Sequence, residues 1–224
     1  MNQFIDSRLE KAYEYELDGD IDEAIKIFEE NLKEFPNSTH LLMELAGLYY
    51  IMGEMTKCIS YYEKVLILKP KSNFVLYRLG VALYRSTNFS KGVEVFNKLI
   101  KSGKNLPMTY IWLGLCYYHL GQEENSIKAY KKLLELSPET CMANYYLGIA
   151  LTSAGKYDEA IPHFSKLIND HDNHVSAHYH LGRVYMKTFK YEKAKTQFKQ
   201  VLELDPLNQN AAEMYAYITD DYSF

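Results

Sequence analysis

Apolar and polar residues alternate along this chain with the period of a helix, and the whole pattern recurs every 34 residues, the spacing of Leu79, Leu113 and Leu147. The clearest copy is Leu113-Gly114-x-x-Tyr117, and weaker copies begin at Leu45, Leu79, Leu147 and Leu181. Counted from Ile5, the period divides the chain, without insertion or deletion, into repeats 5–38, 39–72, 73–106, 107–140, 141–174 and 175–208. A constant period of this length indicates stacked supersecondary units.

Each repeat predicts two helices, because two sets of positions fall on narrow helical stripes. Positions 4, 7, 8 and 11 form the buried face of a first helix, and positions 17, 20, 24 and 27 that of a second. Glycine occupies position 8 in four repeats, at Gly80, Gly114, Gly148 and Gly182. Glycine inside a helix costs about 1 kcal/mol relative to alanine. We therefore expect a close approach there to the small residue at position 20, with the large residue at position 24 filling the space that remains.

Turn residues mark the ends of these helices. Position 15 is Gly19, Gly53, Gly121 or Gly155, which favours a left-handed residue at the end of the first helix, whereas Thr87 and Phe189 depart from the pattern. Position 32 is Pro36, Pro70, Pro138 or Pro206, which stops the second helix, and Lys104 and Asp172 depart. Pro162 is compatible with the second helix of repeat five only if that helix begins near Asp158.

Together these columns resemble the tetratricopeptide repeat. Position 20 is small in every repeat, being Ala24, Cys58, Gly92, Ser126, Ala160 and Ala194. Position 24 is aromatic in every repeat, being Phe28, Tyr62, Phe96, Tyr130, Phe164 and Phe198. The resemblance covers residues 5–208 and implies an all-α protein: a right-handed superhelical α-solenoid of helix-turn-helix repeats, forming a single domain over residues 1–224.

The two ends of the array differ from its middle. Repeat one carries Arg8 and Lys11 at positions 4 and 7, so we expect its outer face to meet water as an N-terminal cap. Residues 209–219 continue the same stripe with Ala212, Tyr215, Ala216 and Thr219 and predict a capping helix. A short acidic and aromatic tail, residues 220–224, should follow it.

Composition favours a cytoplasmic protein without cofactors. Hydrophobic residues make up 47% of the chain, the formal net charge is −4, and no apolar run is long enough to span a membrane. The N-terminus lacks the basic and apolar regions of a signal peptide. The three cysteines, Cys58, Cys116 and Cys141, are scattered, so we expect reduced structural thiols.

Positions 2, 5, 9, 12 and 13 of each repeat point away from the predicted core, with position 6 at the edge. In tetratricopeptide repeats they line the concave, ligand-binding face. Most of them here are apolar or aromatic and none is acidic across repeats two to six, which indicates a binding surface. The candidate partner-binding residues are Tyr50, Phe74, Tyr77, Arg78, Tyr84, Arg85, Met108, Ile111, Trp112, Tyr118, His119, Met142, Tyr145, Tyr146, Tyr179, His180, Arg183 and Lys187.

These residues predict a protein-interaction scaffold or adaptor. Arg78 with Arg85, and Arg183 with Lys187, form basic spots on either side of an aromatic middle, so we expect a partner peptide or helix with apolar anchors and acidic residues. Trp112, Tyr118, Tyr145 and Tyr146 are the expected anchors. Two alternatives remain open: a self-associating structural element that forms homo-oligomers, and a face whose side chains simply pack against one another.

Other functions have weaker support in the sequence. The Lys and Asn clamp that holds chaperone C-termini in related domains is missing. The pI near 6 and the few basic residues on the expected face argue against nucleic acid. No nucleotide-binding or catalytic motif points to an enzyme. A metal site formed by His171, His174, His178 and His180 stays open as a minor alternative. It is a minor one because His178 should be buried whereas His180 should lie near the groove, so the four side chains are not expected to converge.

Overall fold

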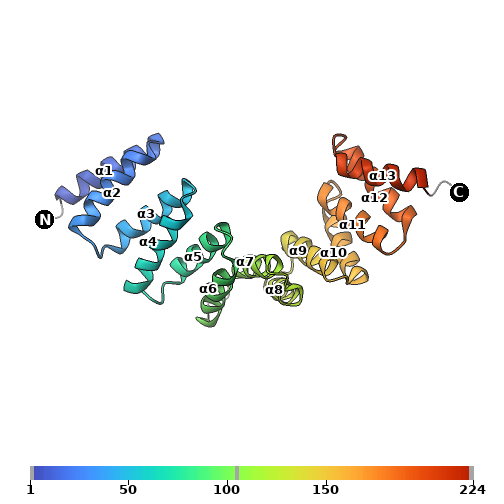
Figure 1. The fold of residues 1–224 in the computed structure, drawn as a ribbon, viewed down its shortest axis with the longest axis horizontal. Helices are drawn as coiled ribbons and strands as arrows, with labels where there is room; N and C mark the ends of the chain where they lie inside the picture. The colour runs from blue at the N-terminus through green and yellow to red at the C-terminus, as the bar shows by residue number, and fades with distance from the viewer. Residues whose placement is uncertain (1–2, 104–105, 222–224) are drawn as a thin grey trace. The chain divides into compact units, whose positions relative to one another are not determined.

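A computed structural model describes residues 3–103 and 106–221, which form thirteen helices and no strand (Figure 1). In order the helices are α1 (Gln3–Asp18), α2 (Ile21–Glu34), α3 (Thr39–Ile51), α4 (Met55–Leu68), α5 (Asn73–Arg85), α6 (Phe89–Lys101), α7 (Pro107–His119), α8 (Glu123–Leu136), α9 (Cys141–Ser153), α10 (Tyr157–Asp170), α11 (Val175–Lys187), α12 (Tyr191–Leu204) and α13 (Gln209–Asp221). Odd-numbered helices up to α11 are the first helices of the six repeats and even-numbered helices the second. The all-α helical repeat solenoid is thereby confirmed.

Two helix boundaries bear on particular expectations. Helix α10 begins at Tyr157, next to the predicted Asp158, and tolerates Pro162 inside it. Helix α13 ends at Asp221, two residues later than the predicted capping helix. Residues 222–224 of the predicted tail lie outside the described residues. Lys11 is exposed and the guanidinium of Arg8 pairs with Glu34 at 2.9 Å, as expected for a water-facing first repeat.

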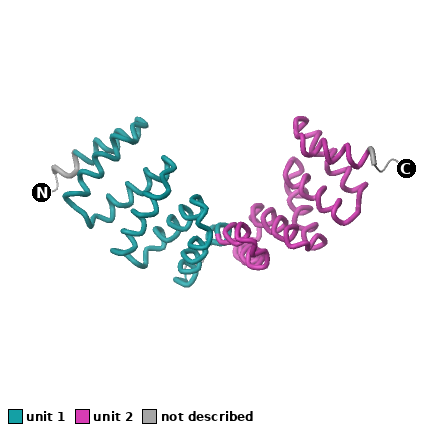
Figure 2. Tube along the Cα trace, viewed as in Figure 1, with its two compact units in different colours: residues 1–112 teal, residues 113–224 magenta. Residues whose placement is uncertain are grey.

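The chain divides into two compact units, an N-terminal unit of residues 1–112 and a C-terminal unit of residues 113–224 (Figure 2). The boundary falls inside α7. In the N-terminal unit the fully buried rings are Phe28, Tyr62 and Phe96, and in the C-terminal unit they are Tyr130, Phe164 and Phe198. All six occupy position 24, so each unit contains the same kind of core. The single domain expected from the sequence stays a prediction.

The glycines at position 8 lie directly against these rings. A Cβ atom on Gly114 would stand 2.5 Å from the ring of Tyr130, and one on Gly148 would stand 2.7 Å from the ring of Phe164. The large residue at position 24 thus fills the space beside the glycine, as expected. Position 20 contributes in a second way: the Ser126 hydroxyl donates to the Gly114 carbonyl oxygen at 2.9 Å.

All six turns between the paired helices have the same geometry. The residue at position 15 has a positive φ in every repeat, including Thr87 (61°) and Phe189 (58°). In each turn the following amide donates to a carbonyl five residues earlier, as Asn88 does to Leu83 at 2.9 Å and Lys190 to Tyr185 at 2.8 Å. A non-glycine residue in this conformation costs about 1–2 kcal/mol. The repeat geometry therefore overrides the local preference of Thr87 and Phe189.

The second helices end where the sequence predicts. Helices α2, α4, α8 and α12 end two residues before Pro36, Pro70, Pro138 and Pro206. Helix α10 ends at the same position although Asp172 replaces the proline. After α6 the chain turns at Gly103, whose φ is 84°.

Candidate functional site

Aromatic rings and arginines interleave on the first helices of the N-terminal unit. The guanidinium carbons of Arg78 and Arg85 lie 5.4 and 4.4 Å from the centre of the Tyr50 ring, which is within cation–π distance. Arg78 also donates from Nε to the Tyr62 hydroxyl at 3.2 Å. The first predicted basic spot is therefore a packed cluster on Tyr50, and of its two arginines only Arg85 is exposed.

Trp112 is held by two tyrosines of the preceding repeat. Its Nε1 donates to the Tyr77 hydroxyl at 2.9 Å, and its ring centre lies 5.1 Å from that of Tyr84. All three residues are only partly exposed. Trp112 is therefore held in place by its contacts with Tyr77 and Tyr84.

A pocket of about 250 Å³ in this unit includes acidic residues that the sequence reasoning missed. Glu16 and Glu44 line it together with Phe74 and Arg78. Burial raises the pKa of Glu44, and the Glu16 carboxylate raises it further. Glu44 occupies position 6 of repeat two, so including this position in every repeat would have found it. Glu16 belongs to repeat one, the predicted N-terminal cap, whereas the candidate surface was taken from repeats two to six.

The C-terminal unit has its own aromatic cluster around His180. The Tyr145 hydroxyl and His180 Nε2 are 3.3 Å apart, and the His180 ring stacks on Phe164 with centres 5.6 Å apart. Burial lowers the pKa of His180 to about 4. The imidazole is therefore neutral at pH 7. Tyr146 stacks on Tyr130 at 5.6 Å.

Two pockets lie on either side of α11 in this unit. One, of about 250 Å³, is lined by α9 residues such as Ile149 and Thr152 and by Tyr118. The other, of about 600 Å³, is lined by α11, the turn after it, the start of α12, and α13. Arg183 and Lys187 line both pockets, and among the described residues neither lining contains Asp or Glu. The second predicted basic spot, Arg183 with Lys187, thus lies between two pockets and contributes positive charge to both.

The predicted site residues differ in how much surface they offer. Ile111 is 2% exposed, so its prediction as a contact residue was wrong: it packs in the core. Phe74, Met108, Tyr118 and Met142 are the exposed apolar members, at 58, 45, 36 and 44%. Arg85, His119, Arg183 and Lys187 are exposed polar members. Tyr50, Tyr77, Arg78, Tyr84, Trp112, Tyr145, Tyr146, Tyr179 and His180 are partly exposed.

The histidines of the metal alternative have separate partners. His178 is buried between the Gln197 side-chain oxygen at 2.7 Å and the Asp172 carbonyl at 3.0 Å, and His174 caps α11 by accepting from the Ala177 amide. His171 Nε2 lies 3.2 Å from Cys141 Sγ. Among the side chains that the structure describes, no three of His, Cys, Asp or Glu are grouped so that they could hold a metal ion.

Two cysteines behave as small apolar side chains. Burial raises the pKa of Cys58 to about 11 and that of Cys116 to about 12. Both thiols therefore stay protonated at neutral pH. Cys141 is the partly exposed third cysteine.

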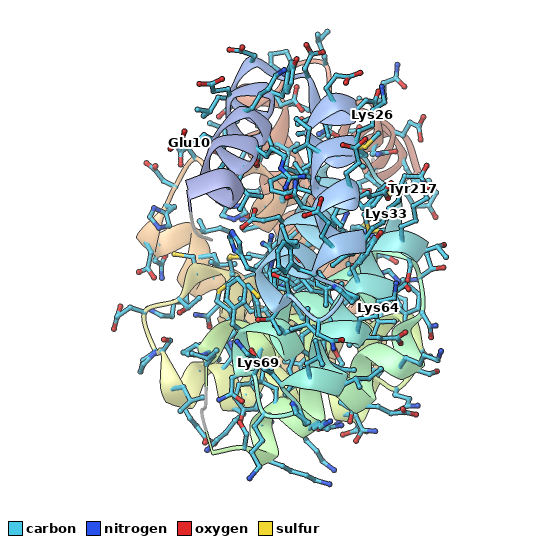
Figure 3. All side chains as sticks on the ribbon, turned by 90° about the vertical axis from the view of Figure 1, so that its left-hand side faces the viewer. Glu10, Lys26, Lys33, Lys64, Lys69 and Tyr217 are labelled. Carbon is cyan, nitrogen blue, oxygen red and sulfur yellow. The ribbon has the colours of Figure 1, made fainter. Side chains whose placement is uncertain are left out.

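The second helices of the N-terminal unit present a different, charged surface. Lys26 and Lys33 on α2 and Lys64 on α4 project along one flank, and Glu10 of α1 projects on the opposite side (Figure 3). These side chains are exposed. No helix in the described part of the chain is long and apolar enough to cross a membrane.

Comparisons with known proteins agree with the repeat pattern. Models described as tetratricopeptide repeat match residues 6–38, 39–72, 74–102, 107–140, 124–174 and 151–218. No curated protein sequence matches the chain.

Among solved structures, PilW, a widely conserved type IV pilus biogenesis factor, is 18% identical with a TM-score of 0.75, over 95% of this chain and 99% of that one. YrrB, a repeat protein with an unusual peptide-binding site, is 20% identical with a TM-score of 0.71, over 83% of this chain and 96% of that one. MamA from Desulfovibrio magneticus RS-1 is 20% identical with a TM-score of 0.72, over 76% of this chain and 97% of that one. At these identities the likeness concerns the fold.

The repeat columns, the thirteen helices found among the described residues and the family models, whose matches run from residue 6 to residue 218, lead to one assignment. The chain belongs to the tetratricopeptide repeat family.

Proposed function

We propose that this protein is an interaction scaffold that binds a segment of a partner protein on the concave repeat positions of its first helices. One observation carries the proposal: Phe74, Met108, Tyr118 and Met142 are exposed apolar side chains at these positions on α5, α7 and α9. Exposed apolar side chains gathered on one set of repeat positions are typical of protein-binding surfaces. The fold supports the proposal, since solenoids offer extended binding surfaces.

The partner segment should combine apolar anchors with acidic residues. Arg85, Arg183 and Lys187 are exposed cations beside the apolar side chains, and both pockets next to α11 are free of carboxylates among the residues described. Glu16 and Glu44 add a requirement in the N-terminal unit, where a segment bound beside them would present a basic or neutral side chain. The solved structure of YrrB, with its peptide-binding site, supports this kind of ligand.

The anchors we favour are the exposed residues, rather than Trp112, Tyr145 and Tyr146. Trp112 and Tyr145 hydrogen-bond to Tyr77 and His180, and Tyr146 stacks on Tyr130. Removing any of them would disturb internal packing as well as binding. Phe74 and Tyr118 can be truncated with less damage, because much of each side chain already meets solvent.

The test compares a concave variant with a matched outer-face variant. Phe74→Ala with Tyr118→Ala should lose specific partners from a lysate of the source cells, measured by quantitative mass spectrometry after affinity capture. Lys26→Ala with Lys64→Ala, on the charged flank, should recover them as the wild type does. Circular dichroism and sedimentation should show equal helicity and equal mass for all three proteins. Unchanged recovery by the concave variant would refute the proposal.

No enzymatic role enters this proposal. The residues gathered on the concave positions provide contact area, cation–π stacking and charge, and together they describe a binding surface. Self-association, the alternative from the sequence, would appear in the same sedimentation data as a concentration-dependent mass.

A further inference from the structure

A pocket of about 600 Å³ lies at the end of the C-terminal unit, beside α11. It lies between Tyr179 and Met186 of α11, Tyr191 at the start of α12, and Met214 and Tyr217 of α13. Its volume is in the range of sites that enclose a large side chain or a small ligand. Aromatic rings and flexible methionine side chains make up most of this lining, which suits an aromatic guest.

Phe189 stands at the edge of this pocket in a conformation that its side chain disfavours. It lines the pocket, is 78% exposed and has a φ of 58°. Four other repeats place glycine at this position and form the same turn, so the fold alone does not require a phenylalanine. A strained residue that contributes little to the core, at the edge of a pocket, is the arrangement found at ligand sites.

The positive charge of the pocket indicates which residues would flank a bound aromatic side chain. Arg183 and Lys187 line it and are exposed, and among the side chains that the structure describes, those of residues 8–103 and 106–219, neither has a carboxylate at ion-pair distance. The Arg183 guanidinium rests on the Tyr179 ring at 5.8 Å, which leaves its N–H groups available for a carboxylate. The pocket therefore combines an apolar, aromatic lining with two exposed cations.

We infer that this pocket binds one aromatic side chain of a partner-protein segment, next to one or more acidic residues that pair with Arg183 and Lys187. Phe189 contacts the bound aromatic ring from the pocket edge and determines the preference for it. The inference rests on the proposed function, since it names one part of the partner segment. It adds a site formed with α13, which lies outside the six repeats.

The test uses defined peptides with the whole chain. A labelled seven-residue peptide, in which one phenylalanine stands between two acidic pairs, is titrated by fluorescence polarisation at low salt. We expect binding by the wild type. Binding should weaken about tenfold when alanine replaces the peptide's phenylalanine. It should weaken by a similar factor when amides replace the peptide's carboxylates or when the protein carries Arg183→Gln.

Phe189→Gly separates a binding role from a structural one. It should weaken peptide binding about fivefold or more, and it should raise the thermal unfolding midpoint because the strain at φ 58° is relieved. Thr87→Gly is the matched control: it relieves the same strain in the N-terminal unit, so it should raise the midpoint and leave peptide binding unchanged.

Three results would overturn the inference. The first is that Phe189→Gly binds the acidic peptide with wild-type affinity. The second is that the wild type binds the acidic peptide no better than the amide peptide, or does not bind it at all at about 1 mM. The third is a wild-type chain that sediments as a dimer while Phe189→Gly sediments as a monomer, because the pocket would then hold a second copy. A failure here, with partner capture still dependent on Phe74 and Tyr118, would leave the proposed function standing.

Discussion

At the scale of the residue, the same substitution should have opposite effects at two glycines. Gly148→Ala would bring a Cβ to 2.7 Å from Phe164, whereas nothing lies within 4 Å of a Cβ on Gly47. Overpacking a core costs about 1–3 kcal/mol, and alanine gains up to about 1 kcal/mol over glycine in a helix. We expect Gly148→Ala to lower the free energy of unfolding by about 1–2 kcal/mol and Gly47→Ala to raise it by about 0.5–1 kcal/mol. Urea denaturation measures both, and two changes of equal sign would contradict the packing described.

His180 should make stability depend on pH. Burial lowers its pKa in the folded chain to about 4, below the value of 6.5 expected for histidine in the unfolded chain. Between these values the unfolded chain binds the proton and the folded chain does not, so stability rises with pH across this window and falls on acidification. His180→Gln should flatten the dependence between pH 4 and 6.5 in thermal unfolding. A variant that keeps the wild-type slope would show that His180 does not account for this dependence.

At the scale of the element, α13 closes the C-terminal core. Ile218 is 2% exposed and packs with Phe198 and Val201 of α12. Ile218→Ala should lower the free energy of unfolding by about 2–4 kcal/mol, because it leaves a cavity. Glu213→Ala, at an exposed position of the same helix, should change it by less than about 0.5 kcal/mol. Equal effects in urea denaturation would mean that α13 contributes no core.

The helices and turns were largely predictable because the same sequence pattern occurs in all six repeats. The helix pairs, the turn glycines and the prolines after the second helices follow from side-chain spacing and backbone preference, both of which are local properties. What was missed depends on neighbours in space. Ile111 is buried by surrounding elements, and Phe189 adopts a left-handed turn that its own side chain opposes.

The candidate surface was predictable in composition but less so in detail. The choice of positions 2, 5, 9, 12 and 13 as a binding surface stays a prediction, and spacing alone could not tell exposed Phe74 from hydrogen-bonded Trp112. Phe189 and Tyr217 could not be found in this way, since they lie in a turn and in a helix outside the repeats. A pocket is a property of several elements together, and no single repeat column describes it.

At the scale of the whole molecule, we expect a partner segment to contact the concave repeat positions. Site-specific photocrosslinking tests this most directly. A benzoylphenylalanine at Tyr118, which is exposed at a concave position, should form adducts with a captured partner, whereas one at Lys64 on the charged flank should not. Adducts from Lys64 without adducts from Tyr118 would contradict the account.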